Sequence, residues 1–188
     1  MNSGARVFRG KNSVLEIPRA RGGSHIPLPS LRGWVRCLKK GDVILADILD
    51  AAATETVLAD VFAPWIQALG IRVEETGPDG GRFRLPGGDE VCRSGGDGPP
   101  VMCGQALASA ADTVSVLSLC AANGRFRNCT TVDLTTHFMR PVIGADAILS
   151  TEILSNGRRM AVVRVTAAAD GSSKPAASAT LAFAYLED

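Results

Sequence analysis

The chain has 188 residues, of which 46% are apolar and 21% charged, with a formal net charge of +1. This length suits one domain with some residues to spare. A charge so close to zero gives no reason to expect a nucleic-acid or membrane partner, and no continuous apolar run is long enough to cross a bilayer. The five cysteines contain no C-x-x-C pair and the two histidines no ligand spacing. We therefore expect no disulfide framework, no metal site and a cytoplasmic location.

The first part of the chain differs in composition from the rest. Residues 1–42 are basic, rich in glycine and proline and without periodicity, which predicts a disordered tail before a domain at residues 43–188. Over residues 43–69 apolar side chains recur at helical spacing, and Gly70 stands where a helix C-cap belongs. Pro64 is expected to kink or split this helix.

The remaining elements follow from periodicity. Residues 71–77 and 82–86 alternate apolar and polar side chains around Pro-Asp-Gly-Gly, which predicts a hairpin. Residues 87–100 are rich in glycine and predict a long connection. A long helix is expected from about Gly104 to Ala122. Strand-like runs then follow at residues 130–142, 146–156, 160–169 and 176–187. Helices and strands are partly segregated, so we expect an α+β fold that ends in an antiparallel meander.

The long helix carries one acid among small residues. Asp112 shares a helical strip with Gln105, Ser109 and Ser115, while alanines fill most of the neighbouring positions. Small side chains would let a curved sheet approach this helix closely, which would leave Asp112 poorly solvated. Burial without a cation raises the pKa of a carboxyl toward the range of a general base. The alternative is an ordinary acid on a solvated helix face.

Three motifs occur in a specific order along the chain. Cys103-Gly104-Gln105 opens the long helix, Asp112 follows nine residues after Cys103, and Phe138-Met139-Arg140-Pro141 ends the next strand. This order resembles the hotdog-fold acyl-CoA thioesterases of the phenylacetate-pathway type (4-hydroxybenzoyl-CoA thioesterase-like). In that family the three motifs are His-Gly-Gly, Asp or Glu, and aromatic-x-Arg-Pro. The resemblance covers roughly residues 45–187 and implies a curved antiparallel sheet wrapped around a long central helix.

The resemblance also implies residue roles. Asp112 would be the base that activates water, or the nucleophile that attacks the thioester carbonyl. The backbone N–H of Gly104 would hold the oxyanion, and Thr131 would help to place the water. The surface that holds the nucleotide end of CoA would comprise Arg140, Pro141, Asn156, Gly157, Arg158 and Arg159.

Two residues depart from the family pattern. Cys103 stands in place of the histidine and Gln105 in place of the second glycine. We expect Cys103 to help cap the turn, although a thiol is a weak donor, and Gln105 to supply the polar contact of the missing histidine. The alternative is that Cys103 is a reactive thiolate, because helix N-termini lower the pKa of cysteine.

The resemblance implies hydrolysis of acyl-CoA thioesters, with no cofactor other than the CoA of the substrate. One rival is a non-catalytic hotdog module that binds acyl-CoA or a related ligand. Another is a hydratase, although that activity usually needs an Asp–His pair within one short motif. The acyl group is not defined by the sequence.

The spacing on the long helix predicts a shared site. Gly104 and Asp112 are separated by a helical rise of about 12 Å. Both groups cannot meet one thioester carbon, because each must lie within roughly 3–3.5 Å of its target. A two-fold homodimer that pairs Gly104 of one copy with Asp112 of the other would complete two sites. The resemblance implies such dimers, and tetramers built from them.

Overall fold

The computed structural model describes residues 8–10, 13–15 and 48–186. The chain divides into two units, residues 1–43 and 44–188. In the first unit, strands β1 (Phe8–Gly10) and β2 (Ser13–Leu15) pair antiparallel. The rest of the predicted disordered tail lies outside the described residues, as does the beginning of the first predicted helix.

The helical region before the sheet starts later than predicted. Helix α1 (Ala51–Val61) begins after Asp50, whose Oδ1 accepts a hydrogen bond from the backbone N–H of Ala53 at 2.8 Å. The expectation of helix at Ile48 and Leu49 is therefore wrong. The N–H of Leu49 instead donates to the carbonyl of Ala121, 3.1 Å away, and the Asp50 cap starts the helix. Pro64 opens a separate short helix, α2 (Pro64–Gln67), so the predicted split is confirmed.

One antiparallel sheet forms the body of the second unit. Its strand order is β3-β4-β8-β9-β10-β7. The bounds are β3 Arg72–Gly77, β4 Gly80–Leu85, β7 Cys129–Phe138, β8 Ala147–Asn156, β9 Met160–Ala169 and β10 Pro175–Tyr185. The predicted hairpin is confirmed, and β8, β9 and β10 form a meander. The expectation that the strand at residues 130–142 begins this meander is wrong, because β7 pairs with β10 at the edge of the sheet and not with β8. In the β3–β4 turn, Gly80 has φ +149°, and a Cβ there would lie 2.1 Å from the carbonyl oxygen of Thr151.

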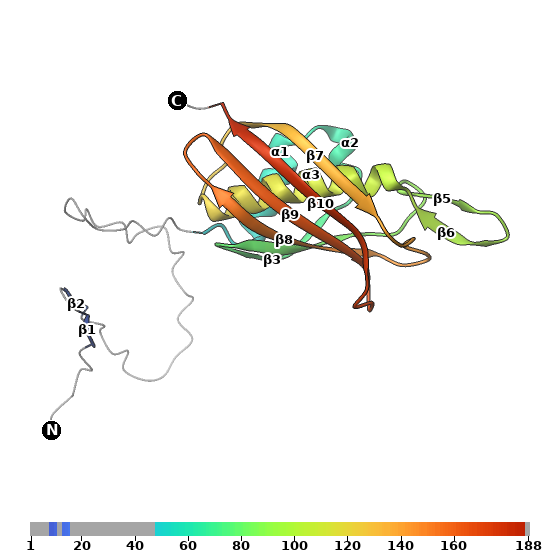
Figure 1. Ribbon diagram of the computed structural model, residues 1–188, viewed down its shortest axis with the longest axis horizontal. Coiled ribbons are helices and arrows are strands. Elements are labelled where there is room, and N and C mark those ends of the chain that lie inside the picture. Colours follow the sequence, from blue (N-terminus) through green and yellow to red (C-terminus); the bar gives the residue numbers. More distant parts are fainter. Residues whose placement is uncertain (1–7, 11–12, 16–47, 187–188) are drawn as a thin grey trace, which may run out of the picture. The chain divides into compact units, whose positions relative to one another are not determined.

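The long helix forms the centre of the core. Helix α3 (Gly104–Ala122) has the predicted bounds, and the strands cross it obliquely (Figure 1). Fully buried Ala110, Val114 and Leu117 face inward-pointing sheet residues, including Phe83 and Phe183. The resulting α+β architecture is a hotdog fold: a curved antiparallel sheet wrapped around a central helix.

Small residues allow the sheet to approach α3 closely. Ser115 and Ser118 are fully buried, and their hydroxyls donate to the carbonyls of Ala111 and Val114, one turn earlier. Ser115 therefore does not share the half-exposed strip of Asp112. By length and overall composition α3 could cross a bilayer, although its apolar residues do not form one continuous run. It is mostly buried inside the domain, as the core helix of a globular protein is.

A second hairpin replaces part of the predicted glycine-rich connection. Strands β5 (Cys92–Gly95) and β6 (Gly98–Met102) pair antiparallel and extend away from the sheet near the start of α3 (Figure 1). Backbone hydrogen bonds hold its base, because the N–H of Met102 donates to Val142 and that of Cys103 to Val91. The hairpin therefore fixes the position from which α3 starts.

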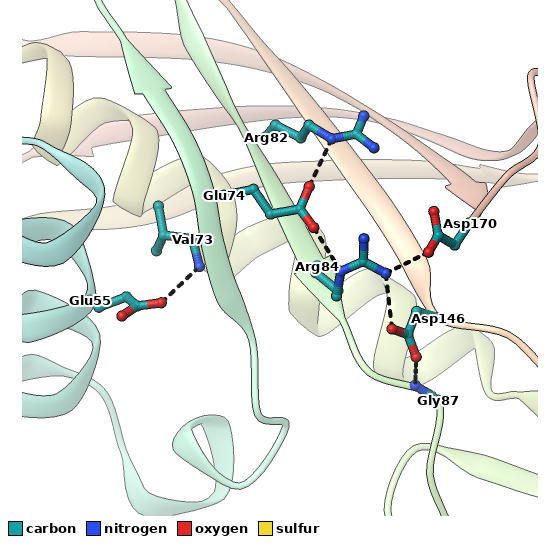
Figure 2. Close-up of polar contacts among 8 residues, drawn as sticks. All are labelled: Glu55, Val73, Glu74, Arg82, Arg84, Gly87, Asp146 and Asp170. Atoms are coloured by element: carbon teal, nitrogen blue, oxygen red, sulfur yellow. Dashed lines mark hydrogen bonds and ion pairs between the residues drawn. The ribbon is translucent and has the colours of Figure 1, made fainter.

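An ion-pair network ties strands together on the face of the sheet opposite α3. The guanidinium of Arg84 lies 2.6 Å from Glu74, 3.0 Å from Asp146 and 2.6 Å from Asp170 (Figure 2). Asp146 also accepts a hydrogen bond from the N–H of Gly87 at 2.9 Å. Ionised partners lower the pKa of all three carboxyls, with the Gly87 bond the largest contribution at Asp146.

Candidate active site

Asp112 and Thr131 form a hydrogen-bonded pair between α3 and β7. The Thr131 hydroxyl donates to Oδ1 of Asp112 at 2.8 Å. Asp112 is half-buried, and it has no ion-pair partner within the described residues. Burial raises the pKa of its carboxyl, while the hydrogen bond from Thr131 opposes part of that rise. The pKa of Asp112 is therefore shifted in the predicted direction.

The pair lies on the wall of a cavity of about 690 Å³. Ala108, Ser109 and Val116 of α3 line the cavity beside Asp112. The remaining lining comes from α1 and α2, from the loop before β7 and from β7 itself. It includes Val61, Phe62, Trp65, Ile66, Phe126, Cys129 and Leu134. Sequence reasoning did not identify these lining residues, because segments far apart in the chain meet only in the folded domain.

The start of α3 offers unpaired backbone donors. The first bond of the helix runs from the N–H of Leu107 to the carbonyl of Cys103, so the earlier N–H groups have no such partner. The Phe138 ring covers Gly104, because a Cβ built on Gly104 would lie 3.2 Å from Phe138 Cζ. Glycine at this position therefore lets β7 approach the helix N-terminus closely.

Cys103 and Gln105 do not cap this end with their side chains. Cys103 occupies the N-cap position, but its thiol makes no capping hydrogen bond, so that expectation is wrong. Its half-buried side chain packs against the core instead. The Gln105 side chain is exposed, and within the described part of the chain it makes no hydrogen bond. A role for Gln105 toward a substrate stays a prediction.

One chain separates the predicted catalytic residues into two groups. Asp112 and Thr131 line the cavity, whereas Cys103, Gly104 and Gln105 do not. β7 connects the groups, since Thr131 contacts Asp112 and Phe138 covers Gly104. The acid and the free backbone donors thus lie at different points along α3, as their spacing predicts.

The residues predicted to bind CoA also lie at two ends of the domain. Arg140 and Pro141 follow β7, near the start of α3, and the Arg140 guanidinium donates to the carbonyl of Pro175 at 2.7 Å. The turn at residues 156–159 lies near the end of α3, because the Asn156 amide donates to Asn123 Oδ1 at 3.0 Å. One chain therefore does not bring the two sets together.

A polar triangle shapes the second of these ends. The Tyr185 hydroxyl donates to Asn156 Oδ1 at 2.7 Å and accepts from the Asn123 amide at 3.1 Å, while Asn156 bonds to Asn123. Arg127 stacks on the Tyr185 ring at 3.4 Å and donates to the carbonyl of Arg158. Asn156 is thus occupied within the fold. No sequence motif pointed to this cluster.

The described part of the chain contains no group of three or more His, Cys, Asp or Glu side chains arranged to hold a metal ion.

Comparisons with known proteins agree with the architecture. Residues 101–184 match the family model of the acyl-CoA thioesterase N-terminal domain. No curated protein matches the chain. Among solved structures, a candidate thioesterase from a Silicibacter species is similar with a TM-score of 0.67 and 23% identity, over 77% of this chain and 97% of that one.

Two further structures are similar. A thioesterase from Haemophilus influenzae has a TM-score of 0.65 and 14% identity, over 77% of this chain and 96% of its own. A conserved protein from Pseudomonas aeruginosa has a TM-score of 0.59 and 25% identity, over 66% of this chain and 95% of its own. The structural neighbours support the hotdog fold, and residues 101–184 are similar to a thioesterase domain.

Proposed function

We propose that this protein hydrolyses acyl-CoA thioesters to the free acid and CoA, with Asp112 as general base or nucleophile. The observation that carries the proposal is the half-buried Asp112 carboxylate, held by Thr131 on the wall of an apolar cavity. A base of raised pKa in such a cavity suits attack on an uncharged carbonyl. Among thioesterases, the motif order favours the phenylacetate-pathway type.

Both roles of Asp112 give a balanced reaction. As base, Asp112 accepts a proton from water while the water oxygen bonds to the carbonyl carbon. The C–S bond of the tetrahedral oxyanion then breaks, and the CoA thiolate takes that proton. As nucleophile, Asp112 bonds to the carbonyl carbon and expels the CoA thiolate, and water hydrolyses the resulting anhydride.

The oxyanion donor would come from a second copy of the chain. The N–H of Gly104 is unpaired within α3 and carries the positive end of the helix dipole. It is about 12 Å of helical rise away from Asp112 in the same chain. We therefore assign this role to the partner's Gly104, placed beside Asp112 across a two-fold axis.

The edge strand β7 suggests how the copies would meet. β7 pairs with β10 on one side and ends the sheet on the other. Val132 is 53% exposed and Phe138 55% exposed, and a long edge strand with apolar side chains is a template for further pairing. Antiparallel pairing about the middle of β7 would bring the partner's Phe138 and the partner's Gly104 toward Thr131 and Asp112.

The same arrangement would gather the basic groups proposed for CoA. Arg140 follows the end of β7, and the turn at residues 156–159 lies near the other end of α3. In an antiparallel dimer the partner's Arg140 would approach Arg158 and Arg159 of the first chain. Guanidinium groups from both copies would then face the phosphates of CoA, which they suit.

The direct test is release of CoA from short, long and aromatic acyl-CoAs by the wild type and by Asp112→Asn. Removing the base should lower kcat by about 10²-fold or more. A matched control is Asp60→Asn, because Asp60 is exposed on α1 and lies outside the cavity lining. Near-wild-type kcat in Asp112→Asn would refute the assigned role.

Loss of activity in this variant should not reflect unfolding. The pKa of Asp112 is higher in the folded state than in the unfolded state. The free energy of unfolding therefore falls as the pH rises from the unfolded-state pKa to the folded-state pKa. The ionised carboxylate is thus unfavourable in the fold at neutral pH. Asp112→Asn should therefore unfold at the same urea concentration as the wild type or a higher one.

The rival function is a non-catalytic module that binds acyl-CoA. It is favoured by the start of α3, where the Cys103 thiol makes no capping bond and Gln105 is exposed. Binding of acyl-CoA without release of CoA from any substrate would establish this function instead.

A further inference from the structure

The cavity beside Asp112 is aromatic and nearly uncharged. Phe62, Trp65 and Phe126 line it, and Asp112 is the one charged side chain among its described lining residues. None of those lining residues is arginine, lysine or histidine. An acyl group that ends in a carboxylate would therefore bring a second negative charge into the cavity of Asp112, with no cation among the lining residues to balance it. This is unfavourable in a poorly solvated site.

A rigid corner between α1 and α2 presents two of the aromatic rings. The side-chain amide of Gln67 donates to the carbonyl of Phe62 at 2.7 Å and to that of Ala59 at 2.9 Å. Ile66 is buried, whereas Trp65 is 62% exposed although it lines the cavity. The two hydrogen bonds from Gln67 hold α1 and α2 together at this corner. The corner in turn places Trp65 at the rim of the cavity.

The volume indicates the size of group that fits. Water takes up about 30 Å³ per molecule in the liquid, and a methylene group is of similar size. A cavity of about 690 Å³ then holds about 20 non-hydrogen atoms. An acetyl group would leave most of this apolar volume unfilled.

We propose that the site selects thioesters of apolar, uncharged acyl groups larger than acetyl, and that Phe62 and Trp65 at the α1–α2 corner are its selectivity residues. The proposal rests on the proposed function, because it takes Asp112 as the group beside the reacting carbonyl. From that point the acyl group runs along the cavity to the corner, where the rings cover its apolar surface. Each methylene of the acyl chain that is buried in the cavity stabilises the complex, and an acetyl group has no methylene to bury.

The test compares acetyl-, octanoyl- and succinyl-CoA in the full chain. The wild type should have a kcat/KM for octanoyl-CoA at least about tenfold above that for acetyl-CoA, and the value for succinyl-CoA should be the lowest. Trp65→Ala should lower the octanoyl-to-acetyl ratio by about tenfold. Val116→Phe, which fills the cavity from α3, should lower the same ratio. Leu154→Ala removes an exposed apolar side chain outside the cavity lining and should leave the ratio unchanged.

Binding of CoA thioethers separates failure of the inference from failure of the proposed function. S-octyl-CoA and S-ethyl-CoA cannot be hydrolysed, so calorimetry measures the cavity without the chemistry. Tighter binding of S-octyl-CoA, weakened by Trp65→Ala, would support the inference even if no acyl-CoA were hydrolysed. Equal affinities, or efficient hydrolysis of succinyl-CoA, would overturn it. If Trp65→Ala changed subunit association but left the octanoyl-to-acetyl ratio of kcat/KM unchanged, the role of Trp65 in selectivity would be overturned.

Discussion

Asp112 combines partial burial with a single neutral hydrogen-bond donor. Glu74 and Asp170 have lowered pKa values because Arg84 lies beside them. Asp112 has only the hydroxyl of Thr131, and burial is the larger influence on its pKa. A carboxylate held this way accepts a proton more readily than an exposed one, which is the property that a general base needs.

Thr131 should set the pH at which Asp112 becomes active. Its hydroxyl bonds to the ionised carboxylate and lowers the Asp112 pKa. Thr131→Val removes that bond, so the pKa should rise and the acid limb of the kcat/KM profile should move to higher pH. Thr131→Ser keeps a hydroxyl and should keep the wild-type profile. An unchanged acid limb in Thr131→Val would show that Asp112 is not the group whose ionisation controls activity.

The sequence predicted some site residues better than others. The position of Asp112 on a helix follows from periodicity. Thr131 was expected in the site only from the family resemblance, as a residue that helps to place the water, and its hydrogen bond to Asp112 was not predicted. Phe62 and Trp65 could not be assigned, because their relation to Asp112 depends on how α1, α2 and α3 pack. The Cys103 cap was expected from its position at the helix start, but the thiol packs against the core instead.

Among the elements, one arginine connects β3 and β4 with the start of β8 and the end of β9 by ion pairs. Arg84 lies among Glu74, Asp146 and Asp170, and within the described residues it is the only cation that forms an ion pair with the two aspartates. Arg72 makes a smaller, longer-range contribution that also lowers the pKa of Asp146. The three carboxyls have lower pKa values in the folded state than in the unfolded state. Their contribution to stability is therefore complete at a pH above the unfolded-state pKa values, and it is lost as the pH falls through the folded-state pKa values.

Arg84→Met should therefore destabilise the domain in a pH-dependent way. At pH 7 the remaining carboxylates would repel one another, so the urea midpoint should fall below that of the wild type. The difference should shrink below about pH 4, as the carboxyls become protonated. Arg93→Met is the matched control, because Arg93 lies on the β5–β6 hairpin and has no ion pair within the described residues. A midpoint difference that did not change with pH would contradict this account.

Strong periodicity explains which elements were predictable. α3 and the four strands after it alternate or repeat clearly, and their expected bounds differ from the observed ones by a few residues at most. The β5–β6 hairpin was missed because β6 contains Pro99 and Pro100, which read as a connection. The early start assigned to the first helix came from apolar spacing alone, whereas the Asp50 cap determines where α1 begins.

For the whole molecule, the main consequence of the fold is that β7 forms one edge of the sheet among the described residues. Nearly every residue of β7 is exposed in a single chain, although the strand carries Val132, Leu134 and Phe138. Edge-to-edge pairing would cover these side chains and extend the backbone hydrogen bonding of the sheet beyond β7. It would also close the open side of the cavity, since Leu134 lines that cavity.

A charge near the middle of β7 should separate the proposed dimer. Val132→Lys places like charges close to the two-fold axis, which should weaken association by about tenfold or more and lower activity in proportion. Sedimentation velocity over a concentration series measures the association. Leu154→Lys is the control, because β8 has neighbours on both sides and Leu154 is 42% exposed. If Val132→Lys associated as the wild type does, β7 would not be the interface.

The central claim, that Asp112 acts with the partner's Gly104, is tested most directly by mixing two inactive variants. Asp112→Asn removes the acid, and Gly104→Pro removes the N–H donor. Proline suits this position, because it is the first residue of α3 and Cys103 before it has φ −68° and ψ 140°. Gly104→Ala is the control, since it adds a Cβ against Phe138 but keeps the N–H.

Loss of the oxyanion donor should lower kcat by about 10²–10³-fold, so both parent homodimers should be nearly inactive. Refolding an equal mixture makes about half of the dimers mixed, and each mixed dimer has one intact Asp112 facing one intact Gly104. The account predicts that the mixture recovers about a quarter of the wild-type rate. Mixed dimers that form, with both chains folded, but stay as inactive as their parents would contradict the shared site.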